Sequence, residues 1–299
     1  MKSTCVVVMW GVLLAGKFAA ARDIYVDNRI GDDRQNGRNP EIVVGSGGPV
    51  RTMAKALRLA TGGDRIVLAA SEIPYREMLS FTSSKHSGAF GRPFIVEGNG
   101  AILDGSNLIP PEGWRWVGGD VFAFRPAGLG YQQFFVNGRA AVRRPSKPAD
   151  RQPPELGVLE WCLSGGEIRF RVEPGRPPAE YQLACCGLRT AITLYHVRHI
   201  VIRNLTLQAF QFDGIAASDA ASGVLLQGIT ARYNGRSGVS VAGASQVELE
   251  QCRLFGNGES QLHNESFART FLRATELVAD TAPAVFSKGG SIQQLPALD

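Results

Sequence analysis

The chain has 299 residues, 44% of them hydrophobic, which is enough to build one large or two small folded units and excludes a disordered tail. Its 35 glycines and 16 prolines favour many short strands joined by tight turns over a helical bundle. The formal net charge of +5 is too small to indicate a nucleic-acid partner.

Residues 1–21 carry the pattern of a secretory signal peptide. Lys2 precedes an apolar run at 5–16, and three alanines at 19–21 come before Arg22. The run is too short to span a bilayer, and no later stretch approaches the roughly 20 apolar residues that spanning requires. We therefore expect a secreted or periplasmic protein without a transmembrane segment. Removing the signal takes away two lysines and no acid, which lowers the formal charge from +5 to about +3.

Residues 22–109 are predicted to form an N-terminal cap and the first windings of a coil of strands. A strand at 24–26 is followed by a Gly/Asp/Asn loop at 31–40. Apolar residues at helical spacing predict a helix over 51–59, ended by Gly62 and Gly63, before a strand at 66–68. Strand-like apolar runs at 94–96 and 102–103 fit one more winding.

The regular succession of short apolar strands is interrupted over residues 110–194. Proline clusters mark loops, and the run from Phe134 to Arg139 predicts a hairpin that turns at Asn137-Gly138. Three of the four tryptophans gather here, namely Trp114, Trp116 and Trp161. We interpret this segment as a β-rich insertion carried on the side of the coil.

A repeat begins near residue 195 and continues to 299. Ile200, Val224, Val247 and Leu272 begin successive segments about 23 to 25 residues apart. Within each segment, apolar residues follow at even spacing on one face, interrupted by a three-residue step. That step predicts a tight bend at three positions, Asn204, Gly228 and Gln251.

A third strand follows a longer turn in every segment. Its inward positions are Ile215, Val239, Leu262 and Val285, again about 23 or 24 residues apart. Leucine-rich repeats would need helices, and propeller blades would need periods of about 40 or more. The sequence therefore predicts an all-β protein, a right-handed parallel β-helix with three strands per coil.

The N-terminal segment also resembles the opening of secreted right-handed parallel β-helix proteins of the pectin lyase-like superfamily. The matching residues are Tyr25-Val26-Asp27, Gly31-Asp32-Asp33, 55–60 and 63–68. The resemblance implies that the helix caps the N-terminal end of the coil, where it would cover an exposed sheet edge. The strand pair around Phe134 is similar to insertions in β-helix proteins that resemble glycoside hydrolases and polysaccharide lyases.

In the pectate-lyase type that this chain resembles, substrate lies across the strand that follows the longest turn. Here that strand begins at Gly214, Gly238 and Gln261, and its outward side chains form one polar row. The outward positions of this strand and the residue before it give a candidate catalytic set, comprising His263, Glu265, Lys288 and Asp213. The same row and the long turn give a candidate substrate-binding set, comprising Asn234, Arg236, Ser240 and Phe286.

These residue types suit sugar chemistry. A His or Lys can take the proton next to a uronate carboxyl, and two carboxylates can work as acid and base in glycosidic hydrolysis. Asp213 and Glu265 would lie roughly 10 Å apart, two rungs of the coil. The same residues also allow plainer roles. His263 would then be an exposed polar strand residue, Asp213 an Asx-type turn residue, and Arg232, Asn234 and Arg236 solvated turn residues.

The sequence lacks the acidic cluster that holds calcium in pectate lyases and the paired Asp and Gly-His-Gly motifs of polygalacturonases. It therefore predicts a polysaccharide-active lyase or hydrolase, with a non-catalytic polysaccharide-binding or surface scaffold as the alternative. A mildly basic surface is compatible with an acidic polysaccharide. No pattern assigns a cofactor or an oligomeric state.

Four cysteines remain after the signal peptide. In an oxidising compartment some of them could pair, and adjacent Cys185 and Cys186 could each bond a different partner. Cys252 falls on an apolar strand position, which predicts a buried free thiol. No CxxC or Cys/His spacing typical of a zinc site is present, so we expect no metal site.

Overall fold

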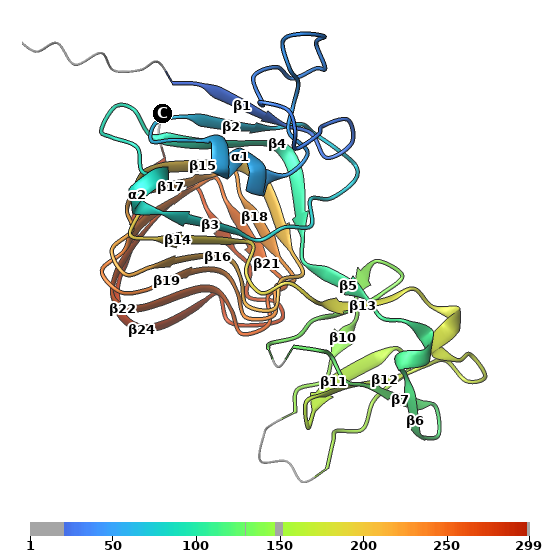
Figure 1. The fold of residues 1–299 in the computed structure, drawn as a ribbon. Coiled ribbons are helices and arrows are strands. Elements are labelled where there is room, and N and C mark those ends of the chain that lie inside the picture. The colour runs from blue at the N-terminus through green and yellow to red at the C-terminus, as the bar shows by residue number, and fades with distance from the viewer. Residues whose placement is uncertain (1–20, 129, 147–151, 298–299) are drawn as a thin grey trace, which may run out of the picture.

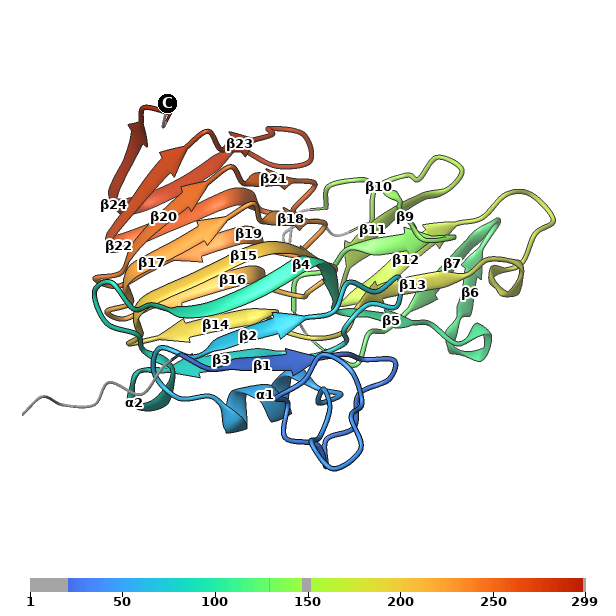
Figure 2. The ribbon, with the colours of Figure 1, turned by 90° about the horizontal axis from the view of Figure 1, so that it is seen from above.

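The computed structural model describes residues 21–128, 130–146 and 152–297, and its main body is the predicted right-handed parallel β-helix. One 15-stranded sheet winds into this coil, seen along its axis in Figure 1 and from the side in Figure 2. Residues 1–20, which hold nearly all of the predicted signal peptide, lie outside the described residues. No helix among the described residues combines the length and the apolar character needed to cross a membrane.

The coil has three faces, which we call faces 1, 2 and 3; in each winding the chain passes from face 1 to face 3 and then to face 2. Face 1 comprises β1 (Asp23–Val26), β2 (Arg65–Leu68), β4 (Phe94–Asp104), β15 (Arg198–Gln208), β17 (Ser222–Gln227), β20 (Gln246–Glu250) and the second halves of β22 (Ser260–Arg273) and β24 (Val285–Leu295). Face 2 comprises β3 (Leu79–Thr82), β14 (Ile192–Tyr195), β16 (Asp213–Ser218), β19 (Ser237–Val241) and the first halves of β22 and β24. Face 3 comprises the last residues of β4 and β15, followed by β18 (Thr230–Arg232), β21 (Arg253–Phe255) and β23 (Glu276–Leu277).

The predicted aliphatic columns are confirmed on faces 1 and 2. Ile200 pairs in register with Val224, and Val224 with Val247, and all three are buried. On face 2 the four predicted inward residues, Ile215, Val239, Leu262 and Val285, also stack rung on rung. Because parallel strands repeat about every 4.8 Å, each column fills the coil interior continuously.

One predicted register is wrong by two residues. Val247 pairs with Thr270, so that Leu272 stacks on Leu249 instead of beginning the fourth segment. Thr270 is 1% exposed, and its hydroxyl donates to the Asn264 side-chain oxygen at 2.8 Å. Since that bond satisfies the hydroxyl inside the core, a polar residue can occupy an inward position that hydrophobicity alone does not reveal.

The bend between faces 1 and 3 lies where the three-residue step predicts it. Asn204, Gly228 and Gln251 all have positive φ angles, of 55°, 59° and 52°. A single left-handed residue at this position turns the strand without adding a loop, which keeps the two halves of β15 in one continuous strand.

The N-terminal helix α1 (Met53–Leu59) is confirmed, and it covers the first end of the coil (Figure 2). Thr52 caps it by accepting from the Lys55 N–H at 3.1 Å, while Glu77 accepts from the first two N–H groups of the helix. Its last turn differs from the prediction, because the C-cap is Ala60, in extended conformation, and not Gly62 or Gly63. A second, unpredicted short helix is α2 (Ser83–His86).

Residues between β4 and β14 form a separate body, which we call the side lobe (residues 106–186). Its first sheet comprises β6 (Arg115–Gly118), β7 (Val121–Phe124), β10 (Val142–Arg143), β11 (Glu160–Ser164) and β12 (Glu167–Arg171). Its second sheet comprises β5 (Ser106–Leu108), β8 (Phe134–Val136), β9 (Arg139–Ala140) and β13 (Leu183–Cys186), and two short 3-10 turns are η1 (Pro111–Gly113) and η2 (Pro178–Glu180).

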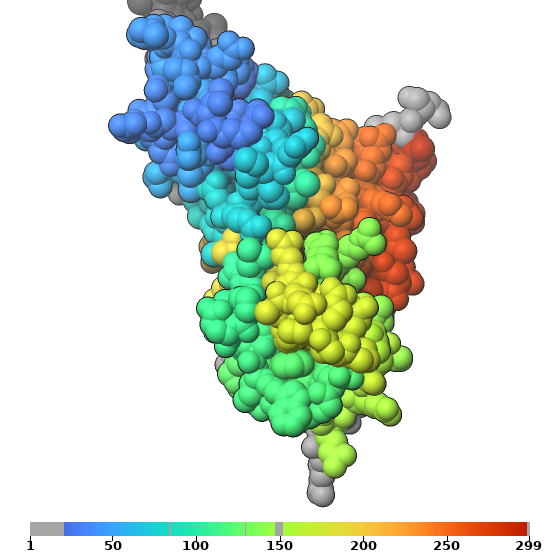
Figure 3. Space-filling view, turned by 90° about the vertical axis from the view of Figure 1, so that its right-hand side faces the viewer, coloured from blue at the N-terminus to red at the C-terminus, as the bar shows by residue number. Residues whose placement is uncertain are grey.

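The side lobe has its own aromatic core. Figure 3 shows the side lobe in front of the coil. Trp161 is fully buried and Trp114 packs on Phe134, whereas Trp116 is 65% exposed. The predicted hairpin is confirmed, with β8 and β9 antiparallel around Asn137-Gly138, both at positive φ.

All four cysteines in the described residues are buried free thiols. This confirms the prediction for Cys252 and contradicts disulfide pairing of Cys162, Cys185 or Cys186. Burial raises the pKa of the Cys185 thiol to about 12 and that of Cys252 to about 11. Protonated thiols in such surroundings behave as small apolar side chains.

Candidate functional site

The predicted site residues on face 2 occupy neighbouring rungs. Ser240 of β19 pairs in register with His263 of β22, and His263 pairs with Phe286 of β24. Two residues further along, Glu265 pairs with Lys288. Because alternate residues of a strand point to one side, this register directs all five away from the coil interior, although Ser240 is itself covered and only 4% exposed.

His263 and Glu265 form the closest pair of ionisable groups in this row. The Nε2 of His263 lies 3.4 Å from the Oε2 of Glu265, with the two side chains 14% and 39% exposed. The distance is long for a hydrogen bond, as is common for catalytic pairs before substrate binds. The imidazole is therefore partly shielded from water, while the carboxylate beside it remains open.

The next rung adds an aromatic surface and a cation. The rings of His263 and Phe286 are stacked at a tilt of 35°, with their centroids 4.7 Å apart. Phe286 is 47% exposed, and Lys288 is exposed on the same strand. An exposed aromatic ring next to polar groups suits the apolar face of a sugar ring.

Asp213 does not contribute an open carboxylate, in contrast to the prediction. It is 1% exposed, and Arg236 forms a two-pronged ion pair with it through Nε at 2.9 Å and Nη2 at 2.5 Å. The Ser237 hydroxyl also donates to it. Its oxygens are occupied by protein donors, so we correct its assignment from catalytic acid to counter-ion of Arg236.

Arg236 itself faces the site. Its side chain is 26% exposed, and its Nη2 lies 3.4 Å from the Ser240 hydroxyl. Ser240 is the register partner of His263 on the preceding rung. Burial would lower the pKa of Arg236, but the bonds and charge of Asp213 outweigh burial and raise it. The guanidinium is thus a fixed positive charge beside Ser240, one rung from the imidazole.

Asn234 was predicted to bind substrate, but it lies inside the coil and is fully buried. Its side-chain oxygen accepts from the Phe210 N–H, and its amide nitrogen donates to the side chain of Asn257 on the next rung. This internal ladder satisfies main-chain groups of the turns that follow face 3. We therefore correct the role of Asn234 from ligand contact to turn support.

The arrangement contains groups that can abstract a proton. Hydrolysis by a pair of carboxylates needs two open acids flanking one bond, and Asp213 is not open. A partly shielded imidazole beside a carboxylate, an arginine and a lysine can instead remove a proton and neutralise a substrate carboxylate. Among the residues that the structure describes, no group of three or more His, Cys, Asp or Glu side chains lies in a metal-binding arrangement.

A cavity that the sequence did not predict lies next to face 3, on the other side of the turns that join face 3 to face 2. It has a volume of about 1030 Å³ and opens between face 3 and the side lobe. Arg232 lines it, in agreement with the open possibility that this residue contacts a ligand. The sequence repeat gave one indication of the residues that line this cavity on the side of the coil. Gln208 and Arg232 occupy the same outward position on consecutive rungs.

Comparisons with known proteins give weak matches. No family model and no curated protein matches the sequence. Among solved structures, one match is the complex of XylC with xylose, at 12% identity and a TM-score of 0.42, covering 91% of this chain and 70% of that chain. Pectate lyase Pel9A matches at 12% identity and a TM-score of 0.41, covering 86% and 54%. A GH136 lacto-N-biosidase from Eubacterium ramulus matches at 10% identity and a TM-score of 0.37, covering 91% and 56%.

The chain thus spans just over half the length of the second and third of these structures.

Proposed function

We propose that this chain is an exported, carbohydrate-active member of the pectin lyase-like superfamily that cleaves a uronate-containing polysaccharide by β-elimination on face 2. The observation that carries the proposal is His263 held between Glu265 and Phe286, with the charge of Arg236 on the adjoining rung. This set offers a base, a sugar-stacking surface and a cation at one place.

In the proposed reaction, His263 removes the ring proton next to the uronate carboxyl. When Nε2 donates to Glu265, the free electron pair lies on Nδ1, which becomes the proton acceptor. Arg236 neutralises the substrate carboxylate, whose negative charge grows as that C–H bond breaks.

The electron pair of the C–H bond then forms the ring double bond, and the bond from the ring to the glycosidic oxygen breaks. Lys288, next to Glu265 in register, supplies the proton to the leaving oxygen. The imidazolium afterwards passes its proton to solvent, and Lys288 takes a proton from solvent, which returns both groups to their starting states. The products are one chain with an unsaturated uronate end and one with an ordinary end.

A panel of uronate and neutral polysaccharides, assayed for both unsaturated products and reducing ends, tests the reaction. We expect unsaturated ends from a uronate polysaccharide, and a loss of about 10² to 10⁴ in rate for His263→Ala. Glu265→Ala and Lys288→Ala should each lower the rate as well. A matched control is His196→Ala, which removes another histidine that faces a carboxylate, Asp219 at 3.6 Å, on an exposed turn.

Each other outcome of the panel contradicts the proposal in a recognisable way. Reducing ends without unsaturation would show hydrolysis. Binding without any turnover would favour a non-catalytic sugar platform built on the same row of side chains. Full activity in His263→Ala would place the chemistry elsewhere.

A further inference from the structure

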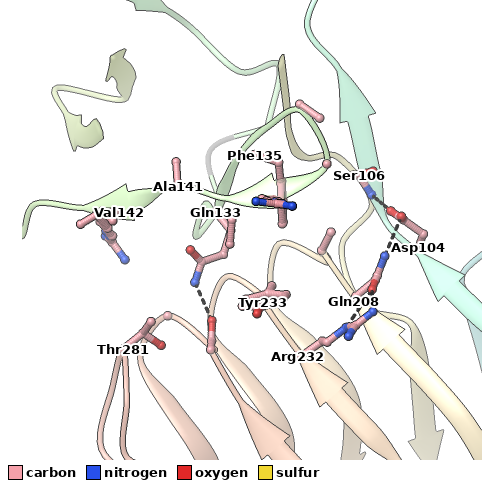
Figure 4. Close-up of a pocket in the computed structure, with 18 of the residues that line it drawn as sticks. Asp104, Ser106, Gln133, Phe135, Ala141, Val142, Gln208, Arg232, Tyr233 and Thr281 are labelled. Atoms are coloured by element: carbon pink, nitrogen blue, oxygen red, sulfur yellow. Dashed lines mark hydrogen bonds between the residues drawn. The ribbon is translucent and has the colours of Figure 1, made fainter. Parts of the chain in front are cut away.

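The cavity between the side lobe and face 3, which we call the lobe cavity, is separate from the row on face 2. Its floor is the end of face 3, and its roof is the β9–β10 segment of the side lobe (Figure 4). Its volume of about 1030 Å³ matches the upper end of small-molecule pockets, which span roughly 300–1,000 Å³. The space therefore suits an extended ligand better than a single ion.

The floor of the lobe cavity is a ladder of hydrogen-bonded polar side chains on three consecutive rungs. Asp104 is register-paired with Gln208, and Gln208 with Arg232. The Gln208 amide donates to Asp104 at 3.0 Å, and its oxygen accepts from Arg232 at 2.9 Å and 3.0 Å. This chain of bonds holds the Arg232 side chain in place at the cavity floor before any ligand arrives.

The charges of the lining favour an anionic ligand. Four arginines line the cavity, namely Arg76, Arg139, Arg143 and Arg232. The acids are Asp104, Glu259 and Asp280, and two of these serve the protein itself. Asp104 accepts from Gln208 and from the Ser106 N–H, and Asp280 accepts from the Gly256 N–H with both oxygens.

The remaining lining favours a sugar over a simple anion. Phe135 of the side lobe and Tyr233 of the coil meet edge to face, with ring centroids 6.5 Å apart, and both line the cavity. Neutral donors and acceptors surround them, including Gln133, whose amide bridges from the lobe to the Gly256 carbonyl at 3.2 Å, and Thr281. Aromatic rings with amides and hydroxyls match the alternating apolar and hydroxyl surfaces of a sugar.

We propose that the lobe cavity is a second carbohydrate-binding site, which holds a carboxylate-bearing oligosaccharide through Arg232 and Arg139. The inference rests on the proposed function in one respect only, namely that the ligand is a sugar. Arg232 approaches the ligand from the coil and Arg139 from the opposite wall, so a uronate chain can lie between them. Such a site would hold a polymer to the protein while face 2 acts on another stretch of it.

The test measures binding of a galacturonate tetrasaccharide by calorimetry in the His263→Ala/Phe286→Ala background, which prevents turnover and removes the exposed ring on which face 2 would stack a sugar. We expect binding to weaken at least tenfold in Arg232→Met and in Arg139→Ser. Arg139 is exposed on a hairpin strand, so its replacement keeps the fold even if Arg232→Met disturbs the ladder. The control is Arg198→Ala, an equal loss of charge at the opposite end of β15, which should bind as the parent does.

Two competitors complete the experiment. Xylotetraose, a neutral chain of the same length, should bind much more weakly, and inorganic phosphate should not displace the tetrasaccharide. Parent-like binding by both arginine variants, or no binding by the parent, would overturn the inference, and displacement by phosphate would reject the sugar. A wild type that binds in the cavity without forming unsaturated ends would instead contradict the function proposed for face 2.

Discussion

The buried ion pair behind face 2 gives a direct prediction about stability. Asp213→Asn keeps the size of the side chain but removes its charge, which leaves Arg236 without its counter-ion in a site where only 26% of its side chain is exposed. The variant also weakens the bond from the Ser237 hydroxyl. The folded state should therefore lose free energy relative to the unfolded chain.

The expected loss follows from the exposure of the two partners. Removing one member of a fully buried ion pair costs about 3–5 kcal/mol. Because water reaches a quarter of Arg236, we expect about 2–3 kcal/mol, a partial reduction of that range. For a chain of this size each kcal/mol lowers Tm by roughly 2–4 °C, which predicts a fall of about 4–12 °C.

Urea and thermal unfolding of four proteins measure the effect. They are the wild type, Asp213→Asn, Arg236→Met and the double variant, which should recover part of the loss because it leaves no unpaired charge. Asp219→Asn is the control, since that carboxylate is half exposed and should change stability by less than about 0.5 kcal/mol. Wild-type stability in Asp213→Asn together with lost turnover would refute the reasoning and restore Asp213 as an open catalytic acid.

Three further predictions concern the interior of the coil. Asn257→Ala should lower the free energy of unfolding in urea by about 2–4 kcal/mol, because it removes hydrogen bonds from buried Asn234 and from the Ala231 and Phe255 carbonyls. A loss as small as that of exposed Gln293→Ala would contradict the internal asparagine ladder. Leu226→Ala should cost about 2–5 kcal/mol, whereas Leu225→Ala, on the outward side of the same strand, should cost much less; equal losses would contradict the register. Burial raises the pKa of Cys252 to about 11 from an ordinary value of 9.0, so the unfolded chain loses this proton first as the pH rises. The free energy of unfolding should therefore fall between about pH 9 and 11, and the fall should be smaller in Cys252→Ala. Identical slopes in the two proteins would show that the thiol is accessible to solvent.

The coil itself could be predicted because its signal is periodic. Inward aliphatic residues recur every 23 or 24 positions, and each column is a repeated choice that hydrophobicity reveals. The hairpin at Asn137-Gly138 could be predicted for a local reason, since both residues accept the left-handed conformation that the turn requires.

Polar residues that serve the interior could not be predicted. Thr270 faces the core and Asn234 supports a turn from inside, whereas both types of residue are mostly found on a solvated surface. Only the bond partners distinguish the two cases, namely Asn264 for the threonine and Asn257 for the asparagine. Burial of Asp213 was hidden for the same reason, because its partner Arg236 is on the following rung.

The lobe cavity depends on contacts between distant parts of the chain. The bond from Gln133 to Gly256 joins residues 123 positions apart, and no repeat or motif indicates that the side lobe folds over face 3. The arginines on its two walls therefore remain unrelated in the sequence until the lobe is placed against the coil (Figures 2 and 4).

The most direct test of the account is a crystal structure of His263→Ala with a bound uronate oligosaccharide. It should show a sugar ring over Phe286 on face 2, with the carboxylate within hydrogen-bonding distance of Arg236 and a ring hydrogen directed at the position of the missing imidazole. An oligosaccharide bound elsewhere on the coil, with face 2 left to solvent, would contradict it.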